Sequence, residues 1–294
     1  MVFTEMKPTA VHLHLYYMQR WPEIRKYLEH LDAGEYHLYV TLSQENAPLA
    51  QAIKAFHPQS TVWQTPNRGY DVGPFVDFLQ KVDLSRYDLI LKIHTKNKSG
   101  LQKTWINGRC ITKKRWVDLL MNALLGSADI WRRNLEAFAA DPRLGMISSR
   151  YLITQEPECS DYLRPEIERV LKQMGLCVPD KITFAAGTMF LVRARLLEKI
   201  KQSFTAADFP PTDASVQDGT LAHVFERVFG CVVEAQGYAV KGFDKRRWFE
   251  MQAKLYRVSR FFYSNDITRS NHQLIKICKI PVYYKNLNHH PRGS

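Results

Sequence analysis

The amino-acid sequence predicts an α/β fold with a mainly parallel central sheet, followed by a basic and aromatic C-terminal appendage. Apolar segments rich in β-branched and aromatic residues alternate with helical segments through the first third of the chain, which is the pattern of parallel βαβ units. The 294 residues are 45% hydrophobic, enough to bury the core of one large domain. Because positive charge is concentrated near the C-terminus, we predict one domain over residues 1–240 and an extension over residues 241–294.

The predicted sheet begins with four strands that are separated by helices. Parallel neighbours need such crossover helices, because a short turn can join only antiparallel strands. Ligands of these sheets bind beyond the carboxyl ends of the strands, so the loops that begin at Ser43, Pro66 and His94 are the places to search. The strands are expected at residues 11–17, 36–43, 60–65 and 87–94, and the helices at residues 21–31, 46–56 and 73–82.

The remainder of the predicted domain is mainly helical. Helices are expected at residues 114–125, 128–140, 195–203 and 219–229, and strands at residues 145–148, 184–192 and 231–235. A long polar stretch between Ser148 and Pro179 receives no element.

Composition excludes several classes of protein. No run of eighteen apolar residues occurs, and the N-terminal residues lack the pattern of a secretory signal, so we expect a cytoplasmic protein. The five cysteines are far apart and form no Cys-x-x-Cys pair, which predicts reduced thiols rather than disulfides or a zinc site. The histidines at positions 12, 14, 30, 37 and 57 show no metal-ligand spacing and are assigned to structural or surface roles.

The net charge of +12 is unevenly distributed along the chain. Residues 241–285 hold eleven Lys and Arg residues against three acids, a net charge of +8. Such a segment attracts anionic lipid, nucleic acid or a phosphate-bearing substrate. Aromatic residues are interleaved with this charge: Trp248, Phe249, Tyr256, Phe261, Phe262, Tyr263, Tyr283 and Tyr284. They suit base stacking, an interfacial helix or packing against the main domain, and we favour packing combined with lipid contact over nucleic-acid binding.

The first candidate site is the loop Asn67-Arg68-Gly69-Tyr70-Asp71-Val72-Gly73-Pro74-Phe75, between a predicted strand and a helix. Its glycines allow close backbone approach, and the helix N-terminus that follows attracts phosphate. Arg68 and Asp71 add a phosphate-binding guanidinium and an acceptor for a hydroxyl. The alternative is that Asp71 only caps the helix.

The second candidate site is the end of the fourth predicted strand. If side chains alternate along it, Lys92, His94 and Lys96 point to one side, with Thr95 between them. This concentration of cationic groups predicts an anion-binding site, and the alternative is a basic surface loop.

The third candidate site combines a small-residue segment with the start of a late helix. Gly187, Thr188 and Met189 interrupt an apolar strand, as is needed where a sugar or another backbone comes close. Asp218 is either the N-cap of the helix or a base that takes the proton of an acceptor hydroxyl. His223 and Arg227 share a helix face that could line the pocket, while Glu226 pairs with Arg227 or solvent.

Six segments, taken in order, resemble the rhamnan synthesis protein F family of bacterial polysaccharide transferases. They are NRGYDVGPF, YDLILKIHTK, WVDLLMNALLGS, DPRLGMIS, FAAGTMFLVR and QDGTLAHVFERVFG, and they cover roughly residues 11–240. The resemblance implies a Rossmann-like glycosyltransferase domain of the GT-A type. The implied reaction moves a sugar, with rhamnose as the best guess, from a nucleotide diphosphate donor to a growing surface polysaccharide or lipopolysaccharide O-antigen.

The resemblance also assigns roles to residues. It implies an inverting enzyme with Asp218 as the base, and a lipid-linked glycan acceptor at the inner face of the plasma membrane. The strand end lacks the Asp-x-Asp pair with which such enzymes hold a divalent metal, so the metal requirement stays open and cationic side chains are expected to neutralise the diphosphate. The expected donor-binding residues are Asn67, Arg68, Asp71, Lys92, His94, Thr95 and Lys96, and the expected sugar-pocket residues are Gly187, Thr188, Met189, His223 and Arg227. The alternative is a non-catalytic basic module that binds nucleic acid or membrane.

Overall fold

A computed structural model describes residues 6–97, 103–106, 109–156, 163–212, 219–267 and 272–286. The chain forms two compact units. The first comprises Met1–Gln102 and Thr112–Asp244, and the second comprises Lys103–Ile111 and Lys245–Ser294. Within the described ranges, no helix combines the length and apolarity needed to span a bilayer.

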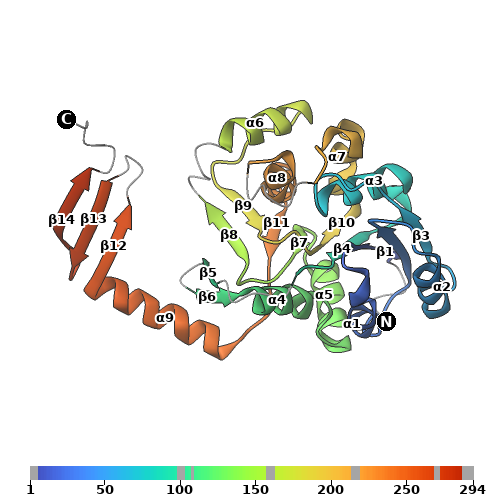
Figure 1. The fold of residues 1–294 in the computed structure, drawn as a ribbon, viewed down its shortest axis with the longest axis horizontal. Helices are drawn as coiled ribbons and strands as arrows, with labels where there is room; N and C mark the ends of the chain where they lie inside the picture. The colour runs from blue at the N-terminus through green and yellow to red at the C-terminus, as the bar shows by residue number, and fades with distance from the viewer. Residues whose placement is uncertain are drawn as a thin grey trace, which may run out of the picture. The chain divides into compact units, whose positions relative to one another are not determined.

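The first unit is built on a seven-stranded sheet in the order β11-β7-β10-β4-β1-β2-β3 (Figure 1). Strands β1 to β4 are parallel, and β10 is antiparallel to both of its neighbours. The predicted α/β class with a mainly parallel central sheet is therefore confirmed. The strands are β1 (Thr9–Leu15), β2 (Tyr36–Leu42), β3 (Thr61–Gln64), β4 (Leu89–His94), β7 (Leu144–Ile147), β10 (Phe190–Arg193) and β11 (Ala239–Lys241).

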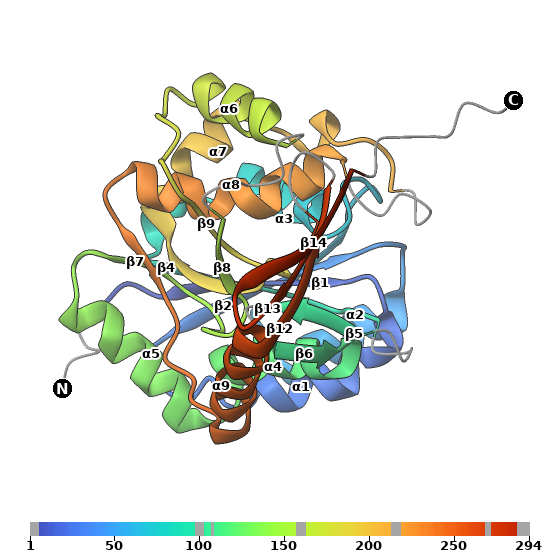
Figure 2. The ribbon, with the colours of Figure 1, turned by 90° about the vertical axis from the view of Figure 1, so that its left-hand side faces the viewer.

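Helices cover both faces of this sheet, with α3 and α8 on one side and α1, α4 and α5 on the other (Figures 1 and 2). Every residue of β1 and β4 is consequently buried, which explains why both read as continuous apolar runs apart from a few polar positions. Those polar positions form the site below. The helices are α1 (Trp21–Leu28), α2 (Ala47–Phe56), α3 (Val72–Lys81), α4 (Lys113–Leu125), α5 (Ala128–Ala140), α6 (Arg164–Gln173), α7 (Glu198–Ser203) and α8 (Leu221–Ala235).

Side-chain caps set where several helices begin. Asn46 accepts a hydrogen bond from the backbone N–H of Leu49 before α2, and Ser127 does the same for Ile130 before α5. Thr220 caps α8 in a reciprocal box with His223. The interpretation of Asp218 as the N-cap of this helix is therefore wrong.

The single strand predicted at residues 184–192 is also wrong. Strand β9 (Ile182–Ala185) pairs with β8 (Ile153–Glu156) in a separate two-stranded sheet, and β10 starts only at Phe190. Between them Gly187 and Thr188 have positive φ angles of 94° and 53°. An extended strand cannot continue through such residues, so the apolar run is divided by a turn.

Two further segments differ from the predicted secondary structure, because their sequences do not show a clear helical or strand periodicity. The strand predicted at residues 231–235 is the end of α8, whose Cys231, Val232 and Val233 are all buried. A fully buried helix segment and a buried strand look alike in sequence. The unassigned polar stretch contains β8 and α6, where Ile167, Val170 and Leu171 form a narrow buried stripe.

The second unit consists of short strands and one helix. Its strands β12, β13 and β14 form an antiparallel sheet directly after α9 (Figure 2). Helix α9 (Arg247–Phe262) and the strands β12 (Tyr263–Ile267), β13 (His272–Ile277) and β14 (Ile280–Asn286) occupy the basic appendage, in which no helix or strand was predicted. The unit also contains β5 (Lys103–Ile106) and β6 (Arg109–Thr112, whose last residue belongs to the first unit), which lie outside the appendage.

Candidate functional site

A buried ion pair lies at the centre of the candidate site. Lys92, in the middle of β4, has only 1% of its side chain exposed, and its Nζ is 2.5 Å from Oδ2 of Asp71. The same Nζ donates to the carbonyl oxygen of Thr188 at 2.8 Å. The rings of Phe75, Phe190 and Phe229 surround the ammonium group at 5.4–6.0 Å. A lysine in such apolar surroundings needs this carboxylate, because an unpaired buried charge is strongly destabilising.

Asp71 connects three segments that are distant in sequence. It stands at the N-cap position of α3 but makes no capping hydrogen bond, so the cap interpretation is wrong. Its Oδ2 accepts from Lys92 and, at 2.5 Å, from Oγ1 of Thr188, while Nδ1 of His94 lies 3.5 Å away. Burial raises the pKa of Asp71, but His94, Lys92 and Lys96 lower it by more, so the net shift is downward and the carboxylate stays ionised.

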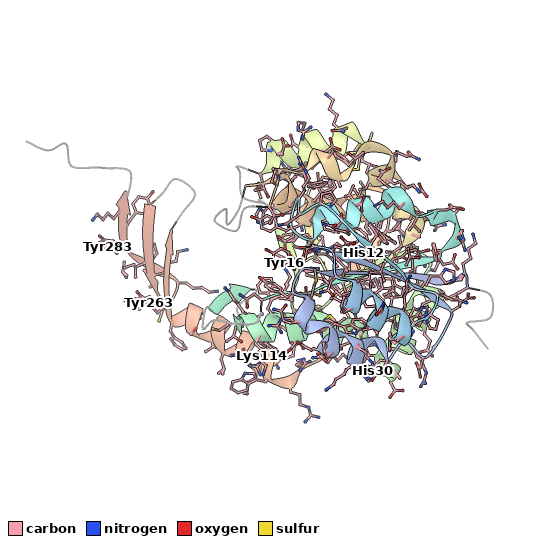
Figure 3. The ribbon with its side chains drawn as sticks, turned by 45° about the vertical axis from the view of Figure 1, so that its right-hand side comes forward. His12, Tyr16, His30, Lys114, Tyr263 and Tyr283 are labelled. Carbon is pink, nitrogen blue, oxygen red and sulfur yellow. The ribbon has the colours of Figure 1, made fainter. Side chains whose placement is uncertain are left out.

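Three buried histidines lie beside this pair. His12 and His14 on β1 are the register partners of Lys92 and His94 on β4, and both rings reach Oγ1 of Thr41, at 3.1 and 3.0 Å. Figure 3 shows His12 inside the domain. Burial lowers the pKa of all three imidazoles, to about 4 for His14 and well below 6.5 for the other two. At neutral pH they therefore offer hydrogen bonds rather than charge.

These histidines predict acid lability. In the unfolded chain the pKa of these histidines is near 6.5. On acidification the unfolded state therefore binds protons at pH values where the folded state does not. The free energy of unfolding should therefore fall as the pH drops below 6.5, by about 1.4 kcal/mol per pH unit for each histidine, down to about pH 4 for His14. Urea unfolding at pH 7, 6 and 5 measures this slope.

Asp71 does not contribute in that window, because its folded pKa lies below the ordinary 3.8 and its protonation affects stability only at lower pH. The variant His14→Gln should show a shallower slope than the wild type. A free energy of unfolding that stays constant between pH 7 and pH 5 would contradict the assignment of neutral buried imidazoles.

A cavity of about 280 Å³ opens at the carboxyl ends of β1 and β4, where the sheet topology predicts a ligand. Tyrosine rings form part of its wall, and the backbone N–H of Tyr17 donates to Oγ1 of Thr95 at 2.9 Å, which joins the two strand ends. Neither ring nitrogen of His94 has a hydrogen-bond partner within the protein, although the side chain is only 3% exposed. The lining residues are His14, Tyr16, Tyr17, Tyr70, Asp71, His94, Thr95, Lys96, Asn97 and Thr212.

A second cavity of about 170 Å³ adjoins the first. Tyr70, Asp71 and Lys96 line both cavities, so the half-buried Lys96 stands at their junction. The first turn of α8 contributes to the second cavity, which brings the strand-end cations and the start of the late helix together. Its lining residues are Tyr70, Asp71, Val72, Lys96, Thr188, Ala222, His223 and Glu226.

Left-handed backbone positions flank the site on two sides. Gly69 and Tyr70 have φ angles of 62° and 56°, and the N–H of Tyr70 is held by Oγ1 of Thr212 at 3.0 Å. A Cβ atom on Gly69 would lie 2.7 Å from Phe209. On the other side, a Cβ atom on Gly187 would lie 2.6 Å from the ring of Trp116. Tyr70 is not a glycine, and a side-chain-bearing residue held at positive φ is a feature that clusters at functional sites.

The structure brings most of the predicted residues together, but not all of them. Asp71, His94, Thr95, Lys96, Thr188 and His223 line the two cavities, and Lys92 lies directly behind Asp71. Asn67, Arg68, Gly187, Met189 and Arg227 line neither cavity. Asp218 lies outside the described residues, next to Gly219.

Three of the residues that line neither cavity have other contacts or are buried. Nε of Arg68 donates to the carbonyl oxygen of Phe209 at 2.7 Å, which fastens the loop that carries Thr212. The guanidinium of Arg227 lies 4.7 Å from the ring centroid of Phe184, and Met189 is buried. The positions of Arg68, Met189 and Arg227 therefore give no support to their predicted roles in binding the donor or the sugar.

Sequence reasoning overlooked several residues that the structure places in the site. Tyr16 and Tyr17 follow β1 directly, and the rule that parallel strand ends share an edge could have found them. Glu226 had been set aside, and its expected pairing with Arg227 is confirmed at 2.8 Å. Its other oxygen accepts from the N–H of Gly187 at 2.6 Å, so Glu226 also supports the turn that carries Thr188.

Neither a cluster of metal ligands nor a disulfide occurs in the part of the chain that the structure describes. No group of three or more His, Cys, Asp or Glu side chains there could hold a metal ion. The four cysteines in the same ranges, at positions 110, 177, 231 and 278, are free thiols.

Comparison with known proteins places the chain among relatives from bacteria. It is 27% identical over 183 residues to the "Uncharacterized protein WxcX" of two strains of Xanthomonas campestris pv. campestris. The match covers 62% of this chain and 25% of each relative, so it spans about a quarter of the length of these curated proteins.

Two solved structures have a slight likeness to the chain. One is titled "Crystal Structure of a Mycobacterial Protein" (TM-score 0.35, 10% identity, 97% of this chain and 87% of that one). The other is glucosyl-3-phosphoglycerate synthase from Mycobacterium tuberculosis in complex with Mn²⁺, uridine diphosphate and glucosyl-3-phosphoglycerate (TM-score 0.35, 10% identity, 95% and 90%). Likenesses of this size carry no argument.

A profile described as "Rhamnan synthesis protein F" matches residues 1–238, which include every strand of the central sheet except β11 and every described residue that lines the two cavities. The chain therefore belongs to the rhamnan synthesis protein F family.

Proposed function

We propose that this protein is a glycosyltransferase of the hexosyltransferase class that acts in surface polysaccharide synthesis and uses a nucleotide diphosphate sugar as donor. One observation carries the proposal: Lys96 stands at the junction of two adjoining cavities, backed by the buried Lys92–Asp71 pair, at the carboxyl ends of β1 and β4. Family membership supports a role in polysaccharide synthesis. A bipartite donor fits two connected cavities with a cation between them.

The larger cavity suits the nucleoside diphosphate. Its tyrosines offer apolar faces for a base, and Asn97, Thr95 and His94 offer polar atoms. The neutral ring of His94 lacks a partner in the protein, so we assign it a hydrogen bond to the donor. Asp71 is held ionised and faces both cavities, which suits a hydroxyl of ribose or sugar.

The smaller cavity suits the sugar that is transferred. In the proposed step, the oxygen of an acceptor hydroxyl bonds to the anomeric carbon while the bond from that carbon to the diphosphate oxygen breaks. The diphosphate leaves with the electron pair and is stabilised by Lys96. The proton of the acceptor passes to Asp218, which stands three positions before Leu221, the first residue of α8, whose first turn borders this cavity. Attack from the side opposite the leaving group inverts the anomeric configuration.

A divalent cation does not fit the described donor set. Of the two carboxylates that line the cavities, Asp71 accepts from Lys92 and Thr188 through Oδ2, and both oxygens of Glu226 accept, from Gly187 and Arg227, which leaves Oδ1 of Asp71 to meet a ligand. Mg²⁺ and Mn²⁺ prefer carboxylate and other oxygen ligands that are available to them. We therefore assign the neutralising role to Lys96, with Lys92 keeping Asp71 in place.

The finer features of the proposal follow from the family. We propose rhamnose as the sugar and thymidine diphosphate as its carrier. The acceptor would be a lipid-linked glycan, such as a growing O-antigen or another lipopolysaccharide chain, at the inner face of the plasma membrane.

The proposal predicts that Lys96→Ala weakens donor binding. A charge-assisted contact contributes about 1.5–3 kcal/mol, so the dissociation constant of the nucleoside diphosphate should rise about 10- to 100-fold. A thermal-shift titration measures it, with the diphosphates of uridine, guanosine, cytidine and thymidine, each with and without manganese. The diphosphate that stabilises the wild type most identifies the carrier.

The matched control is Lys54→Ala, on the exposed side of α2, which should bind as the wild type does. Two results would count against the proposal: no diphosphate stabilises the wild type, or Lys96→Ala binds the preferred diphosphate unchanged.

A further inference from the structure

Helix α9 of the second unit presents an apolar stripe to solvent. Trp248, Met251, Leu255, Val258 and Phe262 follow one another at spacings of three, four, three and four residues, which places them on one face of the helix. Each is between 43% and 59% exposed. Contiguous apolar surface of this kind is uncommon on a monomer and marks a surface that binds something.

The apolar surface continues from α9 into the sheet that follows. Tyr263 comes directly after Phe262 and pairs with Ile277, which pairs in turn with Ile280. These three side chains are 54%, 51% and 65% exposed. The turn between β13 and β14 is held at the helix end, because the N–H of Cys278 donates to the carbonyl oxygen of Phe262 at 2.9 Å. Figure 3 marks Tyr263 and Tyr283 in this unit.

The charge beside the stripe is positive. Arg247 and Lys254 are seven residues apart and flank one edge of the stripe, while Gln252 and Ser259 flank the other. Glu250 lies 3.9 Å from Arg109 within the same unit and is not adjacent to the stripe in the helical period. The exposed basic residues of the described part of this unit are Lys245, Arg246, Arg247, Lys254, Lys279 and Lys285.

This charge decides between two occupants of the apolar surface. A second copy of the helix would need acids opposite Arg247 and Lys254, but the described side chains at the opposing edge of the stripe are the uncharged Gln252 and Ser259. An anionic lipid surface supplies the missing negative charge, and Trp, Phe and Tyr are the side chains that settle at its interface.

We infer that α9 and the adjoining edge of β12–β14 bind in the plane of an anionic membrane surface through the apolar stripe and its flanking cations. The inference rests on the proposed function in one respect. If the acceptor glycan is carried on a membrane lipid, binding to the membrane brings the enzyme to its acceptor. The contact itself requires no catalysis, so the two can be tested apart.

Liposome flotation of the full chain tests the inference. Vesicles of phosphatidylcholine with one quarter phosphatidylglycerol should bind the protein, and pure phosphatidylcholine vesicles should bind it at least about tenfold more weakly. Binding should fall as salt rises from 0.05 to about 0.5 M, because the Debye length shrinks.

The double variant Leu255→Asp/Ile280→Asp should bind at least about tenfold more weakly than the wild type. Lys254→Glu should bind about fivefold more weakly or worse, since each cation near the surface contributes about a factor of five.

Both residues of the double variant are more than half exposed, so their replacement should leave the fold intact. The control Lys54→Glu makes a charge reversal on α2 in the first unit and should float as the wild type does. Equal flotation of the double variant and the wild type overturns the inference. So does a dimer in sedimentation experiments that Leu255→Asp dissolves, which would assign the stripe to a second copy, or a nucleic-acid complex that the same variant abolishes.

The two proposals fail separately. If flotation is lost in the double variant while nucleoside diphosphates still stabilise it, the membrane surface is supported independently of the donor site. If wild-type protein floats but no diphosphate stabilises it, the proposed reaction fails and the membrane inference stands.

Discussion

Replacing Lys92 with methionine should lower the free energy of unfolding by about 3–5 kcal/mol, the range found when one partner of a buried ion pair is removed. The methionine fills similar space among Phe75, Phe190 and Phe229, so the loss reports the charge rather than a cavity. Asp71 would then lie beside Thr188 without the ammonium group of Lys92 that binds it in the wild type. Urea unfolding with a constant slope in denaturant measures the change.

The double variant Lys92→Met/Asp71→Asn separates the ion pair from packing. An uncharged amide in place of the carboxylate no longer needs the ammonium group, so the second substitution should restore part of the lost stability, a coupling of about 0.5–3 kcal/mol. Lys54→Met is the matched control on the surface of α2 and should change stability by less than about 0.5 kcal/mol. A loss below about 1 kcal/mol for Lys92→Met would mean that water from the cavities solvates Asp71. The ion pair would then not be a major contributor to stability.

The strands and helices that frame the site could be predicted from the sequence, because each has the hydrophobic pattern of a single type of secondary structure. Strands β1 to β4 and helices α2, α4 and α5 lie within a few residues of their expected bounds, since Pro, Gly and capping residues separate them. Topology then placed the loops after β3 and β4 at one edge. Alternation along β4 correctly grouped Lys92 with His94, and both are buried on the side that faces Asp71.

Long-range pairing is what the sequence could not reveal. Lys92 binds the carbonyl oxygen of Thr188 because β10 runs antiparallel to β4 with Phe190 opposite Lys92, a pairing across 98 positions (190 − 92). That register depends on the turn at Gly187. The turn could not be predicted, because the apolar sequence continues through it without a break. Thr212 likewise reaches the cavity from a loop whose position is set by Arg68 and Phe209.

The sequence also could not divide the cations by role. Lys92, Lys96 and Arg68 all carry a positive charge near a strand end, yet one is buried in an ion pair, one lines both cavities and one fastens a loop. The difference is one of solvation: only a cation that keeps access to the cavity can meet a ligand's charge. A group of cations near strand ends therefore predicts an anion site without identifying which side chain binds the ligand.

The remaining prediction concerns the base. Asp218→Asn should slow sugar transfer about 100- to 10,000-fold, because a positioned general base contributes that much to the rate. Donor binding in the thermal-shift titration should stay at the wild-type level, since the amide keeps the shape of the side chain and the proposed donor contacts are those of Lys96 and His94. The assay measures nucleoside diphosphate released from thymidine diphosphate rhamnose in the presence of a lipid-linked rhamnose oligosaccharide. Asp129→Asn, at a side chain that is 91% exposed on α5, is the matched control.

The other acids and bases at the smaller cavity are already engaged. Asp71 holds Lys92, and both oxygens of Glu226 accept hydrogen bonds, from Gly187 and Arg227. Nδ1 of His223 contacts the hydroxyl of Thr220 at 2.8 Å in the helix cap. A side chain that already accepts hydrogen bonds in this way loses one of them when it takes the proton of the acceptor hydroxyl. Wild-type transfer by Asp218→Asn would therefore move the base to Glu226, and Glu226→Gln would then have to lower the rate while leaving the donor affinity unchanged.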